Sequence, residues 1–456
     1  MKDFLSKLFW NKKILILGFG REGQSTYKLI REYFPQRNIT IADKRSNISE
    51  QISPEDKLLS FNLGEHYMDG MEEYDLIIKT PGISLQEMPD LVLTGKITSQ
   101  TDLFLQAFAS QVIGVTGTKG KSTTTSLIYH ILKLAGRKAV LVGNIGLPPF
   151  DVVAELDKST VVVFELSSHQ LEFISRAPHI SILLNLFQEH LDHYTSLEAY
   201  HQAKWNISVA QNKDDYFIYN TENQEIKSWV KRDCPKSHLL PFSLDPHLTK
   251  GIIVDKDGEI KISIPDFTSA LFNKDISRNI HGDHNLMNAM AAATACRLVG
   301  VSEANISEGI SSFAGLPHRI EFIGVYGGVK YYDDSIATIP EATIEAIKTL
   351  RDVDTLILGG FDRGIDYNPL IEYLSKSSIC NVIFIGDAGK RIFKGLSGRK
   401  SGINMFVATD YQHVIKIARI QTAKGKICLL SPAAASYDMF RDFEERGEVY
   451  KKIVKS

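Results

Sequence analysis

The chain has 456 residues, and its 52 basic and 54 acidic side chains leave a formal net charge of −2. This balance gives no electrostatic reason to expect nucleic acid or a membrane surface as a partner. The four cysteines lie far apart, which argues against a disulfide framework or a thiolate metal site, and we expect a reducing cytoplasm. No apolar run reaches about 18 residues, so we expect no membrane span. Residues 4–10 contain five large apolar side chains but run straight into Asn11-Lys12-Lys13, so we expect no secretion signal.

Strand-like and helix-like segments alternate from the start of the chain. The first strand is expected at 14–17, a helix at 21–34 and the next strand at 39–42, which together form a compact nucleotide-binding unit. A second start follows, with a strand at 112–115, a glycine-rich turn and a helix at 122–134, and then buried strands at 160–166 and 180–185. This alternation predicts the α/β class with parallel sheets.

The pattern changes between about 214 and 266, where residues 251–254 and 260–262 flank Asp257-Gly258 and predict a hairpin. A third α/β stretch begins after Gly315-Leu316-Pro317, with strands expected near 321–333, 354–359, 382–386 and 427–430. A length of this size favours about three domains. We therefore place the domains at 1–97, 98–314 and 315–456, with a Rossmann-like domain first and last.

The loop Gly18-Phe19-Gly20-Arg21-Glu22-Gly23 is a G-x-G-x-x-G that connects the first strand to the first helix. Asp43 closes the following strand, 20 residues after Gly23. Glycines in this context permit a tight turn and close approach to a pyrophosphate, and the acid can accept hydrogen bonds from a ribose or base. The motif alone predicts NAD or another nucleotide, or else a glycine turn that binds no ligand.

A second loop runs from Thr116 to Thr123 and again joins a strand to a helix. Backbone N–H groups there can cradle phosphates, Lys121 can neutralise them, and the Ser122 hydroxyl can bind Mg²⁺. The loop departs from the strict G-x-x-x-x-G-K-[ST] pattern because position 115 is Val. It predicts an ATP site made by Gly117, Thr118, Lys119, Gly120, Lys121, Ser122 and Thr123.

A simple dehydrogenase needs no triphosphate loop, and a plain ATPase needs no second nucleotide fold, whereas a ligase that uses ATP on a nucleotide-carried substrate needs both. The GTKGKST run resembles the ATP loop of the Mur ligases and the folylpolyglutamate synthases, and further matches follow in family order over nearly the whole chain. On these motifs the chain is identified as a member of the Mur ligase family. Three domains are then implied, which bind a UDP-linked substrate, ATP and an amino acid in that order.

The resemblance implies a metal site that holds two Mg²⁺ ions. Glu165 belongs to a run similar to the family's ELSSxQ segment, and His190 lies in the stretch Asn185 to Tyr194, whose first histidine is a metal ligand in the family. Lys204 matches a lysine that is carbamylated in the family, although the residues alone predict a surface lysine on a helix opened by a Thr195/Glu198 capping box. The implied metal ligands are Ser122, Glu165, His190 and carbamylated Lys204, and the implied catalytic residues are Lys121, Glu165, His190 and Lys204.

Three further residues are implied for ATP. Asn288 lies in a run similar to the family's G-x-H-N-x-x-N-A segment and would recognise adenine, while the same run predicts a helix start with Asp283 as N-cap. Arg319, in the run Gly315 to Glu321 that is similar to the family's GLPHR linker, would face the phosphates, and Asp334 would contact the ribose.

The remaining implied residues bind the UDP-linked substrate and the amino acid. The UDP-substrate set is Gly18, Gly20, Arg21, Gly23, Asp43, Arg45, Gly82, Asn144, Ser167 and Gln170. The amino-acid set comes from a run resembling the LSPA-x-AS-x-D-x-F-x-x-F-x-x-RG stretch of the glutamate-adding branch, from a GGxDR turn and from the DSIAT turn. Its members are Thr338, Arg363, Ser436 and Phe443.

The resemblance therefore implies an ATP-dependent ligase that adds D-glutamate to UDP-N-acetylmuramoyl-L-alanine through an acyl phosphate, in cytoplasmic peptidoglycan precursor synthesis, and we expect a monomer without nucleic-acid or membrane partners. Ile336 stands where the D-glutamate-adding branch usually has Lys, which is similar to a less common branch that adds L-glutamate. A folylpolyglutamate-type ligase, a nicotinamide dehydrogenase and a nucleotide-binding module without catalysis are each compatible with one of the nucleotide loops taken by itself.

Overall fold

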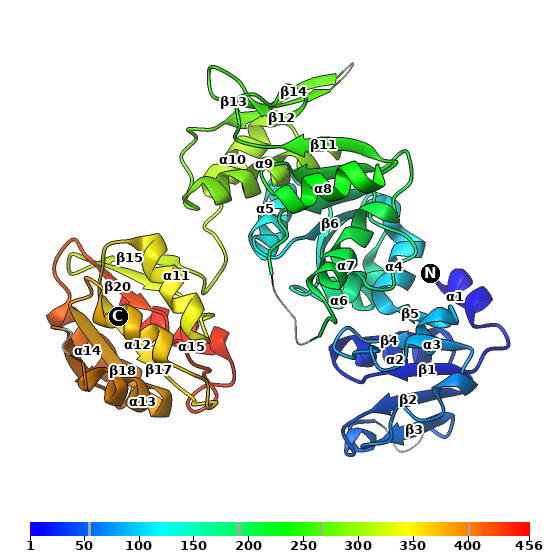
Figure 1. The fold of residues 1–456 in the computed structure, drawn as a ribbon, viewed down its shortest axis with the longest axis horizontal. Helices are drawn as coiled ribbons and strands as arrows, with labels where there is room; N and C mark the ends of the chain where they lie inside the picture. The colour runs from blue at the N-terminus through cyan, green and yellow to red at the C-terminus, as the bar shows by residue number, and fades with distance from the viewer. Residues whose placement is uncertain (53–55, 189–192, 265–266, 400–401) are drawn as a thin grey trace. The chain divides into compact units, whose positions relative to one another are not determined.

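The computed structural model describes residues 1–52, 56–188, 193–264, 267–399 and 402–456. The chain divides into two compact units, Met1–Phe313 and Ala314–Ser456. In the described ranges the strands form three sheets, two in the first unit and one in the second (Figure 1). The predicted α/β class with largely parallel sheets is confirmed. No helix in these ranges is both long and apolar enough to cross a membrane.

The N-terminal sheet has the order β3-β2-β1-β4-β5, and all its strand pairs are parallel. Alternate residues of β1 pack on opposite faces, Ile14 and Ile16 on one and Leu15 and Leu17 on the other, so the strand is apolar throughout. The chain moves outward from β1 in both directions, which places the topological switch point between β1 and β4. The strands are β1 (Ile14–Leu17), β2 (Ile39–Asp43), β3 (Leu59–Leu63), β4 (Leu76–Lys79) and β5 (Ile97–Ser99), and the α-helices are α1 (Lys2–Phe9), α2 (Arg21–Tyr33), α3 (Pro89–Leu93) and α4 (Gln100–Phe108).

The central sheet has the order β14-β13-β12-β11-β10-β9-β6-β8-β7. Its strands from β7 to β12 pair in parallel, and β12, β13 and β14 pair antiparallel. The hairpin predicted around Asp257-Gly258 is confirmed, because Val254 of β12 pairs with Ile260 of β13. The strands are β6 (Val112–Thr116), β7 (Ala139–Gly143), β8 (Val161–Glu165), β9 (Ile180–Leu183), β10 (Tyr216–Asn220), β11 (His238–Phe242), β12 (Gly251–Val254), β13 (Glu259–Ile264) and β14 (Phe267–Asn273).

Helices cover both faces of the central sheet (Figure 1). On one face α9 packs closely against α5, since its buried alanines, Ala289 among them, let the two backbones approach. On the other face α7 contributes Trp205, which belongs to the same apolar cluster as Ile16 of the N-terminal sheet. This shared core explains why the N-terminal and central sheets form one compact unit. The helices are α5 (Lys121–Leu134), α6 (Ser168–Leu171), α7 (Leu197–Val209), α8 (Gln224–Asp233), α9 (Asp283–Leu298) and α10 (Glu303–Ser312).

The second unit holds a sheet of order β15-β16-β20-β17-β18-β19, in which β15 and β16 pair antiparallel and the other pairs are parallel. Leu356 and Leu358 of β17 pack toward α11, α12 and α13, and Ile357 packs toward α14 and α15. The strands are β15 (Glu321–Tyr326), β16 (Val329–Asp333), β17 (Val353–Gly359), β18 (Asn381–Ile385), β19 (Asn404–Val407) and β20 (Ile427–Leu430), and the helices are α11 (Pro340–Leu350), α12 (Asn368–Ser375), α13 (Gly386–Ser397), α14 (Tyr411–Gln421) and α15 (Phe443–Lys455).

Two predicted helix caps are wrong by one residue. The N-cap of α9 is Gly282, with φ of 89°, and Asp283 is the first helical residue. That backbone conformation favours glycine over any residue with a Cβ, so the glycine takes the cap. The helix α7 begins at Leu197, because the Ser196 side chain, rather than that of Thr195, accepts the cap hydrogen bond, from the Ala199 N–H.

Candidate functional site

The loop between β6 and α5 has the backbone of a phosphate cradle. Gly117 and Gly120 have φ of +147° and +85°, values that a residue with a Cβ rarely adopts. The Lys121 ammonium donates to the Gly117 carbonyl at 2.9 Å and to the Thr118 carbonyl at 3.1 Å. A Cβ at Gly120 would lie 2.7 Å from the Asn288 side-chain oxygen, so Asn288 on α9 packs directly against this loop. The structure thus brings two implied ATP residues together.

Asn185 holds the same loop and is absent from the predicted site. Its side-chain oxygen accepts from the Lys119 N–H at 2.8 Å, and its amide donates to the Lys119 carbonyl at 3.0 Å. Its own carbonyl accepts from the Thr118 N–H at 2.9 Å. The available signal was its position, two residues after β9 at the start of the motif that contains His190. His190 itself lies outside the described residues.

The helix α7 approaches this loop with one face. The Tyr200 and Thr118 hydroxyl oxygens are 3.1 Å apart, and the Thr118 hydroxyl also accepts from the Phe187 N–H at 3.0 Å. Lys204, one turn beyond Tyr200, has its ammonium 5.0 Å from the Tyr200 ring centre. Lys204 is only 1% exposed, so the prediction of a surface lysine from the residues alone was wrong. The cause is tertiary, because the face of α7 that carries Tyr200, Ala203 and Lys204 packs into the first unit, whereas Gln202 and Val209 on its other side are exposed.

Glu165 ends β8, the strand beside β6, and its backbone pairs with Val115 just before the phosphate loop. The side chain is fully buried, and one carboxylate oxygen accepts from the Asn144 amide at 2.8 Å. The other oxygen, Oε2, has no hydrogen-bond partner among the described residues. A buried carboxylate oxygen without a partner is costly unless something binds it, and a hard cation prefers such a donor. Glu165 therefore fits the implied Mg²⁺ ligand set.

The glycines of the loop between β1 and α2, and Gly82 after β4, differ in what surrounds their Cα atoms. Gly18 has φ of +91°, and a Cβ there would lie 2.1 Å from the Thr80 hydroxyl. A Cβ on Gly23 would lie 2.1 Å from the Gly18 carbonyl oxygen, so this glycine lets α2 pack on the loop. Gly20 and Gly82 face open space. Close approach of a ligand to the loop is therefore possible at these two positions.

Both carboxylate oxygens of Asp43 already accept hydrogen bonds from other groups of the protein. One carboxylate oxygen accepts from the Phe19 N–H at 2.7 Å, and the other accepts from the Arg45 N–H at 2.9 Å and from Arg45 Nε at 3.0 Å. Arg45 also donates to the Phe19 carbonyl at 3.0 Å. Burial by itself would raise the pKa of Asp43, but the hydrogen bonds from Arg45 and Phe19 outweigh it and lower the pKa. The group that this pair offers to a ligand is the half-exposed guanidinium of Arg45.

Arg21 and Gln170 lie where the N-terminal sheet meets the central domain. Arg21 donates to the carbonyls of Gly143 and Gly146, and the Gln170 amide donates to the Glu22 carboxylate at 2.8 Å. Gln170 and Ser167 also form the capping box of α6. Glu22 was missed as a candidate although it lies in the glycine motif, and burial raises its pKa. These side chains serve contacts within the first unit.

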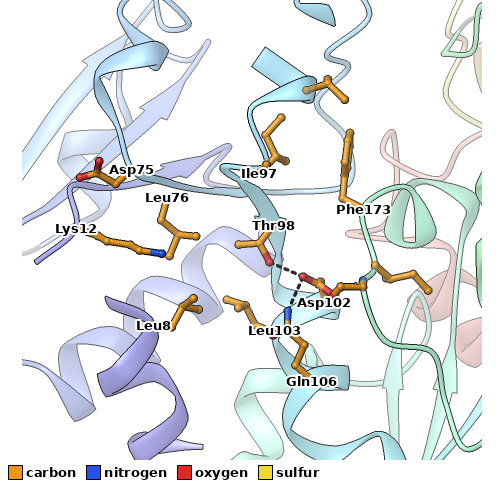
Figure 2. Close-up of a pocket in the computed structure, with 14 residues that line it drawn as sticks. Leu8, Lys12, Asp75, Leu76, Ile97, Thr98, Asp102, Leu103, Gln106 and Phe173 are labelled. Carbon is orange, nitrogen blue, oxygen red and sulfur yellow. Dashed lines mark hydrogen bonds between the residues drawn. The ribbon is translucent and has the colours of Figure 1, made fainter. Parts of the chain in front are cut away.

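A pocket of about 440 Å³ lies in the N-terminal sheet at the amino ends of β4 and β5. Figure 2 shows Leu76 and Ile97, which begin β4 and β5, together with Phe173 around it. Asp102, one of the acids that line it, accepts hydrogen bonds from the Thr98 hydroxyl and the Gln106 amide, each at 2.8 Å (Figure 2). The glycine loop and Asp43 are at the carboxyl ends of the strands, so this pocket is separate from the nucleotide loop.

In the second unit, the turn after β16 carries Asp334. Its carboxylate accepts from the Ser431 hydroxyl at 2.7 Å and from the Ile320 N–H at 3.2 Å. Burial raises the pKa of Asp334 to about 7 despite these hydrogen bonds. Arg319, next to Ile320, is exposed. The structure thus places both of these implied ATP residues at the start of the second unit.

The four implied amino-acid residues also gather at the carboxyl ends of the strands of this unit. Arg363, in the turn after β17, donates to the Thr338 carbonyl at 2.9 Å. Phe443 begins α15, and its carbonyl accepts from the Ser335 hydroxyl at 2.8 Å. Ser436 follows β20 and is 2% exposed. Ligands of open α/β sheets bind at this edge, so the arrangement is suited to a small substrate.

Comparison with known proteins places these features in a family. Residues 115–296 match the Mur ligase middle domain, and residues 318–434 match the Mur ligase glutamate ligase domain. The chain is 33% identical to a UDP-N-acetylmuramoylalanine--D-glutamate ligase of Acetivibrio thermocellus, covering 100% of this chain and 98% of the relative. It is 32% identical to the protein of the same name from Listeria innocua, covering 98% and 97%.

Solved structures agree at the level of the fold. MurF from Acinetobacter baumannii matches with a TM-score of 0.56 and 17% identity over 79% of this chain and 83% of that one. The UDP-N-acetylmuramate-alanine ligase MurC of Thermotoga maritima matches with a TM-score of 0.52 and 19% identity over 97% and 99%. With a family model on each unit and relatives of this identity along the full length, the chain belongs to the Mur ligase family.

Proposed function

We propose that this chain is an ATP-dependent, ADP-forming ligase that joins D-glutamate to UDP-N-acetylmuramoyl-L-alanine in cytoplasmic peptidoglycan precursor synthesis. The observation that carries the proposal is the juxtaposition of the phosphate loop with the buried carboxylate of Glu165, at the ends of the neighbouring strands β6 and β8. One oxygen of this carboxylate has no hydrogen-bond partner in the part of the chain that the structure describes. The names of the full-length relatives support this choice of substrates. The domains would divide at 1–97 for the UDP-linked substrate, 98–314 for ATP and 315–456 for the amino acid.

The reaction would run in two steps. An oxygen of the L-alanyl carboxylate attacks the γ-phosphorus of ATP, the bond to the β,γ-bridging oxygen breaks, and ADP leaves. The amine of glutamate then attacks the acyl carbon of the acyl phosphate, inorganic phosphate leaves with the bonding electron pair, and the amine loses a proton. Catalysis of the first step comes largely from positioning and charge neutralisation. Lys121 and the N–H groups of the phosphate loop would supply both.

Two Mg²⁺ ions would be held by Ser122, Glu165, His190 and a carbamate on Lys204, and would neutralise charge on the phosphates. The support for Glu165 is its oxygen Oε2, which has no hydrogen-bond partner within the described ranges. The support for Lys204 is its burial at 1% exposure, close to the Tyr200 that contacts the phosphate loop. Carbamylation joins the lysine nitrogen to CO₂ with release of a proton, which converts a buried cation into an anion suited to a hard cation.

The UDP-linked substrate would bind along the open side of the glycine loop. Gly20 and Gly82 leave room there, and Arg45 presents a guanidinium suited to phosphate or carboxylate. Asn144 would act by orienting Glu165, to which it donates. Arg21 and Gln170 would act by holding the N-terminal sheet against the central domain. Ser167 would act by capping α6, the helix that carries Gln170.

The test is an assay of ADP release by the purified enzyme with ATP, UDP-N-acetylmuramoyl-L-alanine and each enantiomer of glutamate. Release that depends on D-glutamate supports the proposal. Preference for L-glutamate would keep the ligase reaction but reverse the stereochemistry, an outcome to which Ile336 in the DSIAT turn draws attention. Turnover with a folate and glutamate, and none with the UDP-linked substrate, would favour a folylpolyglutamate-type ligase. A mass measurement in solution tests the expected monomer.

A further inference from the structure

Arg446, on the first turns of α15, is a buried arginine that joins two loops of the second unit. It is 1% exposed, although arginine is almost never fully buried in proteins unless its charge is paired. Its Nε donates to the Ser335 hydroxyl at 2.9 Å, and one terminal nitrogen donates to the Ser335 carbonyl at 2.8 Å. The other donates to the carbonyls of Ala434 and Ala435 at 3.0 and 3.1 Å. One side chain thus connects the turn after β16 to the loop after β20.

Both loops carry residues of the proposed amino-acid site. The turn after β16 continues from Ser335 to Thr338, and the loop after β20 continues from Ala435 to Ser436. The Ser335 hydroxyl, which accepts from Arg446, also donates to the Phe443 carbonyl at 2.8 Å. Thr338 therefore lies three residues after Ser335, and Ser436 lies one residue after Ala435, both of which Arg446 contacts. Phe443 is one hydrogen bond away from Ser335.

The turn after β17 also contacts the Ala435 carbonyl. The Phe361 N–H donates to the Ala435 carbonyl at 2.9 Å, and a Cβ on Gly360 would lie 2.3 Å from that oxygen and 3.1 Å from Arg446 Nη1. This turn leads to Arg363. All four implied amino-acid residues consequently lie on segments whose backbones meet around Arg446.

The charge of Arg446 is compensated only partly. None of the hydrogen bonds that it makes within the described part of the chain goes to a carboxylate, since all four acceptors are neutral. Burial lowers the pKa of Arg446, and the more distant Tyr411, Asp438 and Asp333 act in the opposite direction. A guanidinium remains charged even so, and a buried charge acts strongly on its surroundings because little water screens it.

We infer that Arg446 is a positioning residue for the amino-acid site, because it joins the segments that carry Thr338, Ser436 and Phe443 and adds a buried positive charge that favours an anionic amino acid. This inference rests on the proposed function, in which the second unit receives glutamate. Arg446 would act through the loops and would not touch the reacting atoms.

The test compares Arg446→Met and Arg446→Lys with wild type by steady-state kinetics and by hydrogen exchange of residues 335–338 and 433–436. Arg446→Met removes every donor, so we expect the KM for glutamate to rise about 10- to 100-fold, while the KM values for ATP and the UDP-linked substrate stay within about twofold. Arg446→Lys keeps the charge but cannot reach both loops at once, so it should recover part of the glutamate KM. Exchange in both segments should become faster in both variants.

Arg419→Met is the matched control. Arg419 also donates to two backbone carbonyls, those of Ile453 and Val454, but it does so near the end of α15, away from the proposed site. This variant should leave the glutamate KM and both loop segments unchanged. Equal changes of all three KM values in the Arg446 variants, or unchanged exchange in the two segments, would overturn the inference.

Failure of the proposed function would look different. A wild-type enzyme without any glutamate-dependent ADP release would refute that function. Faster exchange of residues 335–338 and 433–436 in Arg446→Lys would then still support the joining of the loops, and unchanged exchange would refute it.

Discussion

The loop from β6 to α5 and the loop from β1 to α2 both connect a buried parallel strand to a helix and both contain a glycine with positive φ. They differ in what their side chains do. In the first, Lys121 rests on carbonyls of its own loop, where phosphate oxygens can displace them, and Asn185 fixes the backbone from outside. In the second, Arg21 and Glu22 are used in contacts with the central domain, and Asp43 is used by Arg45 and the Phe19 N–H.

The two loops show that a motif determines a backbone shape more reliably than it determines which side chain meets the ligand. The glycine pattern requires a tight turn in both loops. Whether an acidic or basic side chain near the turn remains available to a ligand depends on the hydrogen-bond partners that the neighbouring domain provides. We therefore expect large effects from substitutions at the phosphate loop and smaller effects from substitutions beside the N-terminal loop.

The largest effect is expected for Lys121→Ala. Removing the cation that neutralises transferred phosphate should lower the rate of ADP release about a thousandfold. The fold and the binding of the UDP-linked substrate should be unaffected, because the lysine ammonium donates to carbonyls of its own loop. Stopped assays and calorimetry measure the two quantities. Lys133→Ala, an exposed lysine later on α5, is the control, and wild-type activity in Lys121→Ala would contradict the ATP-loop assignment.

The second effect concerns the buried lysine beside this loop. Lys204→Ala should lose about a hundredfold in activity, and a small carboxylate such as formate or acetate should restore part of it by replacing the missing carbamate anion. Lys213→Ala, an exposed lysine after the same helix, should behave as wild type. Full activity of Lys204→Ala without added carboxylate would refute the carbamate. Mass spectrometry under native conditions offers a second readout, since wild type should carry the added mass of CO₂.

A smaller effect is expected at the N-terminal loop, from Arg45→Ala. In the Arg45–Asp43 ion pair, the half-exposed guanidinium of Arg45 is the group that a ligand can reach. Its loss should raise the KM for the UDP-linked substrate about tenfold, which corresponds to about 1.4 kcal/mol of binding free energy. The KM for ATP should not change. Lys44→Ala removes a neighbouring exposed cation, whereas the ion pair of Asp43 is with Arg45, so this variant controls for net charge. Equal changes in both KM values would contradict a separate UDP-substrate domain.

The smallest effect is expected for Asp43→Asn, which acts through Arg45. The KM for the UDP-linked substrate should rise only severalfold, and stability at pH 7 should fall by about 1 kcal/mol. The folded state lowers the pKa of Asp43 below 3.8, so its contribution is present above that pH and is lost as the pH falls through the lower, folded-state pKa. Urea unfolding of both proteins at pH 7 and near pH 3 should show a stability difference that shrinks in acid.

A pH-independent difference between these two proteins would mean that the Asn variant loses packing rather than a charged hydrogen-bond acceptor. An increase in the UDP-substrate KM larger than that of Arg45→Ala would mean that Asp43 contacts the ligand directly. Either result would change the comparison between the two loops.

The sequence alone determined the local elements. The strand at 14–17 matches β1 in full, the hairpin around Asp257-Gly258 is present, and the strand at 427–430 coincides with β20. Such segments are predictable because side-chain periodicity and turn residues act over a few neighbouring positions. The positive φ values of Gly18, Gly117 and Gly120 belong to the same class, because the freedom to adopt a positive φ is intrinsic to glycine.

Only the tertiary structure decided which side chains are buried or already occupied. Lys204 is buried because one face of α7 packs into the first unit, and Asp43 is already occupied because it accepts a hydrogen bond from the Phe19 N–H of the loop after β1. Asn185 reaches the phosphate loop across strand ends, and Arg446 reaches Ser335 over a separation of 111 residues. Hydrogen bonds and burial depend on groups that meet only after the sheets have formed, and a local pattern contains no information about those partners.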